Sequence, residues 1–291
     1  MSLVRNLPKT NFHPFGRVPA IFAVCAGLLA FGCGDDDGAI DGGLPDTGIL
    51  FDARMDAPPP CRRIRSGGAP GGDGSPAAPF ASIDEAMSMA SEGDVFCLEP
   101  GEHAPPTEAI NVAVTFEALS PDMTTAIAAA AGACRTIPVP NAFTPEETVE
   151  LDVLLESNAP IVLRDITLLG CHIGLFLRDG GVLEQVRIER STTNVLVIGG
   201  LLDVRASSFR PMAMLVMPLG LGRIALFGIS PARIQVSEDT VMELGDGLGI
   251  GVWTYGVGVQ LADLTINGGV SGFFLDGRSD NPSIQIGPNV T

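Results

Sequence analysis

A short aliphatic pattern returns at nearly regular intervals through the second half of the chain, and this repeat restricts the fold more than any other feature. It is found at 163–168 (LRDITL), 183–188 (LEQVRI) and 201–206 (LLDVRA), and again further along the chain at 261–266 (LADLTI). Shorter apolar segments recur between these, at 174–177, 194–197, 213–216 and 272–275. A period of about 18–20 residues, with Gly, Asn and Asp at the corners, is typical of stacked repeats that share one core. The repeat predicts an all-β solenoid, with a β-sandwich as the alternative because short strands and turns also fit that fold.

A short helix is expected just before the first strands. Ser82 followed by Glu85 forms a capping box, and Ile83, Ala86, Met87 and Ala90 then make one apolar stripe at helical spacing. Glu-Gly-Asp at 92–94 ends the stripe, and VFCL at 95–98 reads as a strand. We therefore predict an amphipathic helix over 82–91. It would cover the open N-terminal end of the strand stack, where backbone groups and apolar side chains would otherwise be exposed.

The segment 71–103, GGDGSPAAPFASIDEAMSMASEGDVFCLEPGEH, resembles the beginning of the pectate-lyase-like superfamily of right-handed parallel β-helices. In that pattern a helix covers the N-terminal end, and a motif of the form GDxxxLxPGxY begins the first coil; here His103 stands in place of the Tyr. The resemblance implies a single-stranded right-handed parallel β-helix with an N-terminal capping helix over 61–291. It also implies polysaccharides as ligands or substrates.

The N-terminus carries the features of an export signal. Three cations (Arg5, Lys9 and Arg17) precede an apolar run at 18–31, which is too short to span a membrane. The run ends in LLAFGC, which resembles a lipobox and implies that Cys33 is lipidated after cleavage of a lipoprotein signal peptide, 1–32. The alternative is ordinary cleavage, with Cys33 in a disulfide.

The segment 33–60 is rich in Gly, Asp and Pro, and its few apolar residues have no period. Such a segment cannot bury enough apolar surface to fold, so we predict a disordered acidic tether. The protein is then expected to be exported and lipid-anchored in the bacterial cell envelope. The outer membrane is preferred, because Gly34 after the lipidated Cys carries no recognisable inner-membrane retention signal.

Four cysteines remain beyond the anchor, Cys61, Cys97, Cys134 and Cys171, and export permits disulfides between them. Three connectivities are open, and the short loops favour Cys61–Cys97 with Cys134–Cys171. Free buried thiols are one alternative. A metal site at Cys171 and His172 is disfavoured, because neighbours in a strand point to opposite faces. No metal and no cofactor are predicted.

Two regions fit the repeat less well. The segment 120–150 reads as an insertion that loops out between coils and carries a short Ala-rich helix. The final segment SIQIGPNVT has no evident capping element, so either the sequence is a fragment or the last coil is covered by an oligomeric contact.

The charge of the chain excludes one class of partner. It has 17 basic and 34 acidic side chains, and three of the basic ones precede Cys33, so the mature part has 14 basic against 34 acidic. Nucleic acids and anionic membranes would be repelled by such a surface, and we predict no nucleic-acid binding. Any membrane contact would come through the lipid anchor.

Three arginines, Arg187, Arg205 and Arg223, repeat at an equal spacing along the sequence. If that spacing makes one coil, these arginines stack on one sheet and form a track for an acidic polysaccharide, because guanidinium groups bind carboxylates and sulfates well. The alternative is local pairing with neighbouring acidic residues, which contributes little at a surface.

Trp253 and Tyr255 lie in the glycine-rich stretch 245–259. Trp253 shares a strand face with alternating glycines, so its ring could stack on a sugar; packing in the core or at a corner is the alternative. The GxGxxG-like run in this stretch lacks the strand-to-helix context of a dinucleotide site.

No catalytic residue is predicted. The acidic residues are scattered without a pair suited to acid–base chemistry, and the single lysine lies in the leader. The expected function is therefore a non-catalytic surface module of the cell envelope for adhesion or polysaccharide binding. The alternative is a carbohydrate-active enzyme, either a polysaccharide lyase or a glycoside hydrolase, that acts on an acidic polysaccharide.

Overall fold

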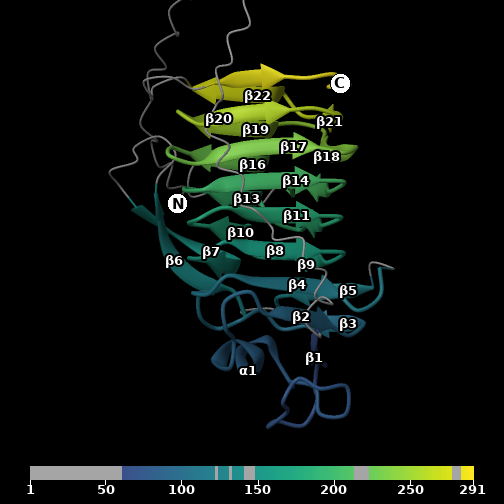
Figure 1. Cartoon of the computed structure of the whole chain (residues 1–291). Helices are drawn as coiled ribbons and strands as arrows, with labels where there is room; N and C mark the ends of the chain where they lie inside the picture. Colours follow the sequence, from purple (N-terminus) through teal and green to yellow (C-terminus); the bar gives the residue numbers. More distant parts are fainter. Residues whose placement is uncertain (1–60, 122–123, 131–132, 141–147, 213–222, 277–282) are drawn as a thin grey trace, which may run out of the picture. The chain divides into compact units, whose positions relative to one another are not determined.

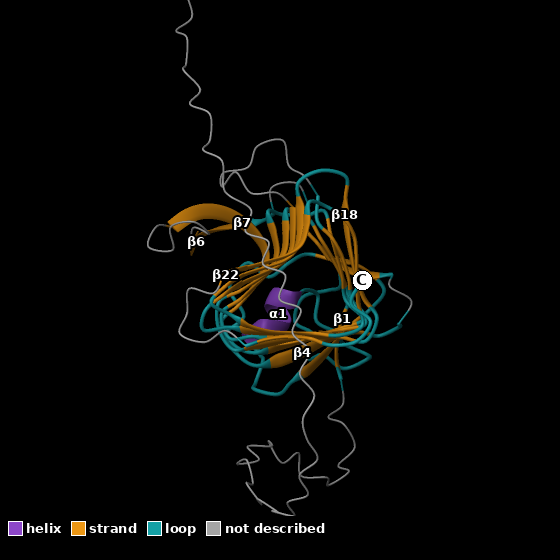
Figure 2. Ribbon diagram, turned by 90° about the horizontal axis from the view of Figure 1, so that it is seen from above, coloured by secondary structure: helices purple, strands orange, loops and turns teal. Residues whose placement is uncertain are grey.

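The computed structural model describes residues 61–291 except 122–123, 131–132, 141–147, 213–222 and 277–282. This part is a right-handed parallel β-helix, in which the chain passes through three sheets in turn and rises by one strand in each per coil (Figure 1). Viewed along its axis, the three sheets surround a common interior (Figure 2). The prediction of an all-β solenoid is confirmed.

Three sheets, A, B and C, make up the β-helix. Sheet A contains, in order, β1 (Arg62–Ile64), β2 (Val95–Leu98), β4 (Val114–Ala118), β8 (Ile161–Arg164), β11 (Gly181–Glu184), β14 (Leu201–Arg205), β17 (Arg233–Ser237), β20 (Gly258–Leu261) and β23 (Ile284–Ile286). Sheet B contains β3 (Gly101–His103), β5 (Thr125–Ala128), β9 (Thr167–Leu169), β12 (Arg187–Glu189), β15 (Ser208–Arg210), β18 (Thr240–Gly245) and β21 (Leu264–Gly268). Sheet C contains β6 (Arg135–Pro140), β7 (Thr148–Ser157), β10 (Ile173–Leu177), β13 (Thr193–Val197), β16 (Arg223–Ile229), β19 (Gly249–Tyr255) and β22 (Ser271–Asp276).

The interior is a column of apolar side chains in register. In sheet A the inward-facing positions pair rung by rung, with Phe96 opposite Phe116, Phe116 opposite Leu163 and Leu163 opposite Leu183. These side chains are fully buried and belong to one core that runs through all the described coils. Because successive residues of a strand point to opposite faces, the residues between them face solvent. The outer surface is thus a set of columns whose members lie about 4.8 Å apart.

The first coil is covered by α1 (Ile83–Ser88), which is shorter than the predicted 82–91. The Ser82 hydroxyl accepts a hydrogen bond from the Glu85 backbone N–H, and Ile83 and Ala86 are buried against the core. The Glu85 carboxylate accepts from the N–H groups of Ala81 and Gly71, and these bonds hold its pKa below the usual value. The predicted cap is present, and it also ties the loop before the helix to the end of the stack.

The region 120–150 belongs to an insertion, since Val114 of β4 pairs with Ile161 of β8 at a separation of 47 residues, whereas Ile161 pairs with Gly181 at a separation of 20. Its internal structure differs from the prediction of a short helix. Thr125–Ala128 is the strand β5 of sheet B, because Ala126 and Ile127 are buried in the stack. β6 and β7 form an antiparallel pair, the one exception to parallel pairing among the described strands. No helix occurs among the described residues of this region. The Ala-rich composition suggested a helix, but small alanine side chains also fit between closely packed strands of adjacent coils.

At the last described coil, the inward-facing Ile284 and Ile286 are 45% and 57% exposed. They pair with Val259 and Leu261, which are buried in the coil below. An oligomeric contact at this end stays a prediction.

Candidate functional site

A polar groove lies on the outer face of sheet A, across β17, β20 and β23. Its volume is about 540 Å³. The inward side chains of these strands, among them Ile234 and Val259, are buried in the core, which directs the alternate residues outward into the groove. The groove is therefore built on rigid strands, and its shape follows from the stacking of coils.

Three glutamines form one column along the floor of this groove. Gln235 pairs in register with Gln260, and Gln260 pairs with Gln285. At the spacing of adjacent strands, the three amides span about 10 Å along the axis of the solenoid. Among the described residues, no hydrogen bond involves these three side chains. Each amide thus offers two donors and one acceptor to a ligand.

A second column borders the glutamines and combines a cation with apolar surface. Arg233 pairs in register with Leu201 on one side and Gly258 on the other. Arg233 is exposed and forms no ion pair with a described residue, and Leu201 is 49% exposed. A Cβ at Gly258 would be in ordinary van der Waals contact with Ser283 Oγ at 3.4 Å, so this glycine presents a flat stretch of backbone beside Ser283. The groove can therefore hydrogen-bond hydroxyl groups, contact the face of a ring and pair with an anionic group.

Below the groove, the outer face of sheet A carries paired charges in place of unpaired amides. Arg164 lies between Glu117 and Glu184 in one column, with N···O distances of 3.7 Å and 3.1 Å. Arg205 continues the column and donates from Nε to Asp203 at 3.0 Å, a bond that raises its pKa. The cations and anions of this part neutralise one another, whereas the amides and Arg233 of the groove have no described partner.

The predicted arginine track is wrong. Arg187 lies in β12 of sheet B, Arg205 in β14 of sheet A and Arg223 in β16 of sheet C. Register pairs Arg187 with Ser208, so a coil here is longer than the spacing between the arginines. The residues at the corners lengthen each coil without changing the alternation of side chains inside the strands. Arginines at a spacing shorter than one coil therefore fall on different sheets.

Trp253 and Tyr255 lie in β19 of sheet C, away from the groove. Trp253 is 5% exposed, and its ring centroid is 4.9 Å from that of Phe274 and 5.8 Å from that of Phe227. These rings belong to an apolar cluster on the outer face of sheet C. The cluster contains a column of register partners that runs from Phe176 through Leu196 and Phe227 to Trp253. Packing was the alternative for Trp253, and the structure supports it.

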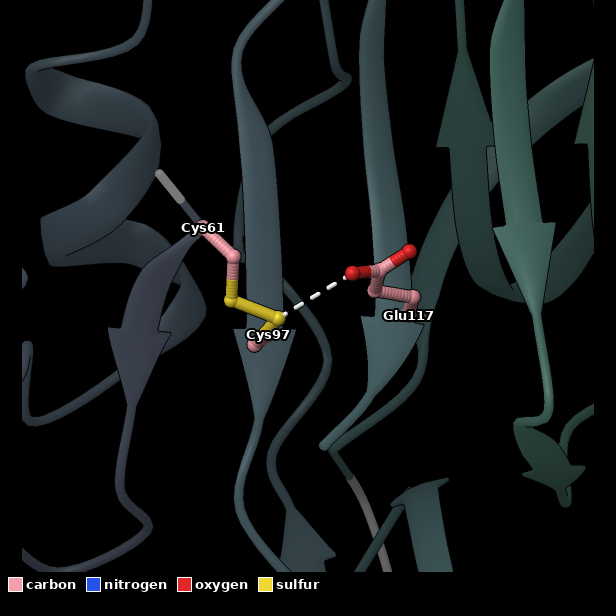
Figure 3. A group of neighbouring side chains, drawn as sticks. All are labelled: Cys61, Cys97 and Glu117. Atoms are coloured by element: carbon pink, nitrogen blue, oxygen red, sulfur yellow. Dashed lines mark hydrogen bonds between the residues drawn. A yellow bond between two sulfur atoms is a disulfide. The ribbon is translucent and has the colours of Figure 1, made fainter. Parts of the chain in front are cut away.

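Both disulfides are formed in the favoured pairing, Cys61–Cys97 and Cys134–Cys171, with Cα–Cα distances of 5.7 Å and 5.8 Å. Within the described part, one group of side chains has donor atoms close enough for a metal ion, Cys61, Cys97 and Glu117 (Figure 3). Both sulfurs of that group are joined to each other, and Glu117 lies 3.2 Å from the Cys97 sulfur. The disulfide links the residue before β1 to the outer face of β2, with which β1 is also paired.

His103 is buried in β3 and bonds through Nε2 to the Glu99 carbonyl oxygen at 2.8 Å. Burial lowers its pKa, which favours the neutral ring. Cys33 and the predicted tether lie outside the described residues. Among the residues described, no helix has the length and apolar character needed to cross a bilayer.

Comparison of the chain with protein-family models, with curated proteins and with solved structures found no match.

The groove residues were missed by the sequence reasoning, although a signal was present. The pattern aliphatic–Gln–aliphatic occurs at 234–236 (IQV), 259–261 (VQL) and 284–286 (IQI), at equal intervals. A polar residue repeated between two inward positions marks an outer column of a solenoid. The shorter period of the aliphatic segments drew attention to the arginines instead.

Proposed function

We propose that this chain is an exported, lipid-anchored β-solenoid of the bacterial cell envelope whose groove on sheet A binds a polysaccharide. The observation that carries the proposal is the column of Gln235, Gln260 and Gln285 beside Arg233, all without a described hydrogen-bonding or ionic partner. A polymer of hydroxyl-bearing rings, lying along the axis, meets equivalent amides at each coil. Arg233 favours a chain that carries carboxylate or sulfate groups.

The anchor and the location are part of the same proposal. They are supported by the lipobox-like LLAFGC, which places the lipidated residue at Cys33, and by the Gly- and Asp-rich segment 33–60 that would separate the β-helix from the membrane. Membership of the pectate-lyase-like superfamily is likewise a proposal, supported by the segment 71–103.

A carbohydrate-active enzyme is the second candidate, and the groove favours binding over it. The described residues that line the groove include no carboxylate and no imidazole. Proton abstraction or glycosidic hydrolysis depends on such groups within hydrogen-bonding reach of the substrate. Incubation with polygalacturonate should therefore leave the absorbance of unsaturated ends flat, and a rise in that absorbance would favour the lyase.

The groove is tested by removing two of its amides. In isothermal titration calorimetry, the best ligand from a glycan array should bind Gln260→Ala/Gln285→Ala about 5- to 150-fold more weakly than the unsubstituted chain, because each of the two lost hydrogen bonds contributes about 0.5–1.5 kcal/mol. Both side chains are exposed and make no described contact that folding needs, so circular dichroism should be unchanged.

Thr115→Ala is the matched control. Thr115 occupies the same outer column of sheet A, far below the groove, through the register Thr115–Val162–Val182–Asp203–Gln235. Its removal should leave the affinity unchanged. Equal affinities for all three proteins would refute binding in the groove.

A further inference from the structure

A second cavity, of about 370 Å³, lies at the turn from sheet B into sheet C, away from the groove. Five charged side chains line it, Glu189, Arg190, Arg210, Arg223 and Glu243. Such a gathering of arginines is unusual for a chain with twice as many acidic as basic residues.

Both carboxylates of the cavity are occupied by neighbours. Glu189 pairs in register with Arg210, and its Oε1 lies 3.9 Å from Nη1 of Arg210 and 3.9 Å from Nε of Arg187. Glu243 accepts a hydrogen bond from the Asn267 amide at 2.9 Å. Glu243 also directly follows Met242, the register partner of Phe209, so it lies one strand beyond Arg210 in the same column. Glu189, Arg210 and Glu243 thus alternate in charge along sheet B.

Arg190 and Arg223 have no carboxylate within ion-pair distance among the described residues. Arg190 follows β12 at the corner, in the left-handed region with a φ of 61°. Arg223 begins β16, and its guanidinium lies against the loop that contains Gly245 and Gly247. A Cβ at Gly245 would lie 3.0 Å from Nη1, and one at Gly247 would lie 3.3 Å from Nη2. The two glycines therefore leave room for the guanidinium to lie at the cavity wall.

We propose that this cavity binds a tetrahedral oxyanion, a phosphate or sulfate group, between Arg190 and Arg223. Two guanidinium groups that face one space repel each other, and an anion between them converts this repulsion into two attractive contacts. The planar N–H fork of Arg donates paired hydrogen bonds to phosphate and sulfate oxygens. The site lies on a different sheet from the groove and does not depend on the polysaccharide proposal.

The probes are inorganic phosphate, inorganic sulfate, dextran sulfate and unsulfated dextran, titrated into the full chain by calorimetry at low ionic strength. We expect at least one of the three anions to bind and unsulfated dextran not to bind through this site. Arg190→Gln/Arg223→Gln should weaken that binding tenfold or more. Arg164→Gln removes an arginine that is paired on sheet A, and it should leave the affinity within twofold.

The titrations with the three anions distinguish a free oxyanion from one that is carried on a polymer. Binding of the inorganic ions assigns the site to a free anion, and binding of dextran sulfate alone assigns it to an ester carried on a polymer. The proposal is overturned if none of the three anions binds, or if Arg164→Gln weakens binding as much as the double variant. Should the double variant fail to fold, ¹⁵N side-chain spectra of the unsubstituted chain decide: the anion must shift the Nε–H signals of Arg190 and Arg223, and unchanged signals overturn the proposal.

Discussion

Replacement of Phe116 by alanine is expected to lower the free energy of unfolding by about 3–5 kcal/mol. Phe116 is fully buried in β4, and its ring centroid lies 5.6 Å from that of Phe96 in the coil below. The truncation removes contacts with both adjacent coils and leaves a cavity that the stacked strands cannot close without losing register. Urea unfolding followed by far-ultraviolet circular dichroism measures the change.

Leu248→Ala provides the control for this prediction. Leu248 is 67% exposed, so the same kind of truncation should change stability by less than about 0.5 kcal/mol. If the two variants lost equal stability, Phe116 would not lie in a continuous inner column.

Removal of the second disulfide by Cys134→Ala/Cys171→Ala should lower the free energy of unfolding by about 4 kcal/mol, because the link closes a long loop in the unfolded chain. The sequence separation of this pair is 37, and that of Cys61–Cys97 is 36. The loop-closure argument therefore predicts nearly equal losses for the two double variants. Unfolding curves of both variants, recorded beside the oxidised chain, make the comparison. A large loss for one pair and none for the other would contradict an origin in the unfolded state.

The general architecture could be predicted from sequence because the core imposes a local pattern. Leu163 and Leu183 were expected to lie one coil apart, and they are register partners. The Ser82–Glu85 cap was also found, since capping depends on residues that are close in sequence. The disulfide pairing followed from loop length alone.

Register beyond Leu183 could not be predicted, because it depends on the number of corner residues, which varies from coil to coil. Leu183 pairs with Val204, and Leu201 lies on the outer face as the partner of Arg233. The segment 201–206 nevertheless looks like its predecessors, since alternation within a strand does not reveal which face is inward. Gly200 has a positive φ, and a Cβ there would lie 2.5 Å from the Asp179 carbonyl group, so it lies in a tight corner before β14. The coil from Leu183 to Val204 is 21 residues long, which exceeds the spacing of 18 between the arginines, so Arg205 falls on sheet A and Arg187 on sheet B.

The candidate site depended on the same register. Val204, Val236, Leu261 and Ile286 occupy one inward column, and the first interval between them is longer than the two that follow. Only with these coil lengths do the three glutamines align. The shorter, fixed period of the aliphatic segments would have scattered Gln235, Gln260 and Gln285, as it wrongly aligned the arginines.

Excimer fluorescence from paired pyrene labels tests this register most directly. Labels on Gln260→Cys/Gln285→Cys, which occupy adjacent strands of sheet A, should give excimer emission, with the singly labelled chains as background. Labels on Leu248→Cys/Gln260→Cys, which are closer in sequence but are separated by the whole length of β19 in sheet C, should give monomer emission. Excimer emission from the Leu248–Gln260 pair and none from the glutamine pair would contradict the stacking on which the groove depends.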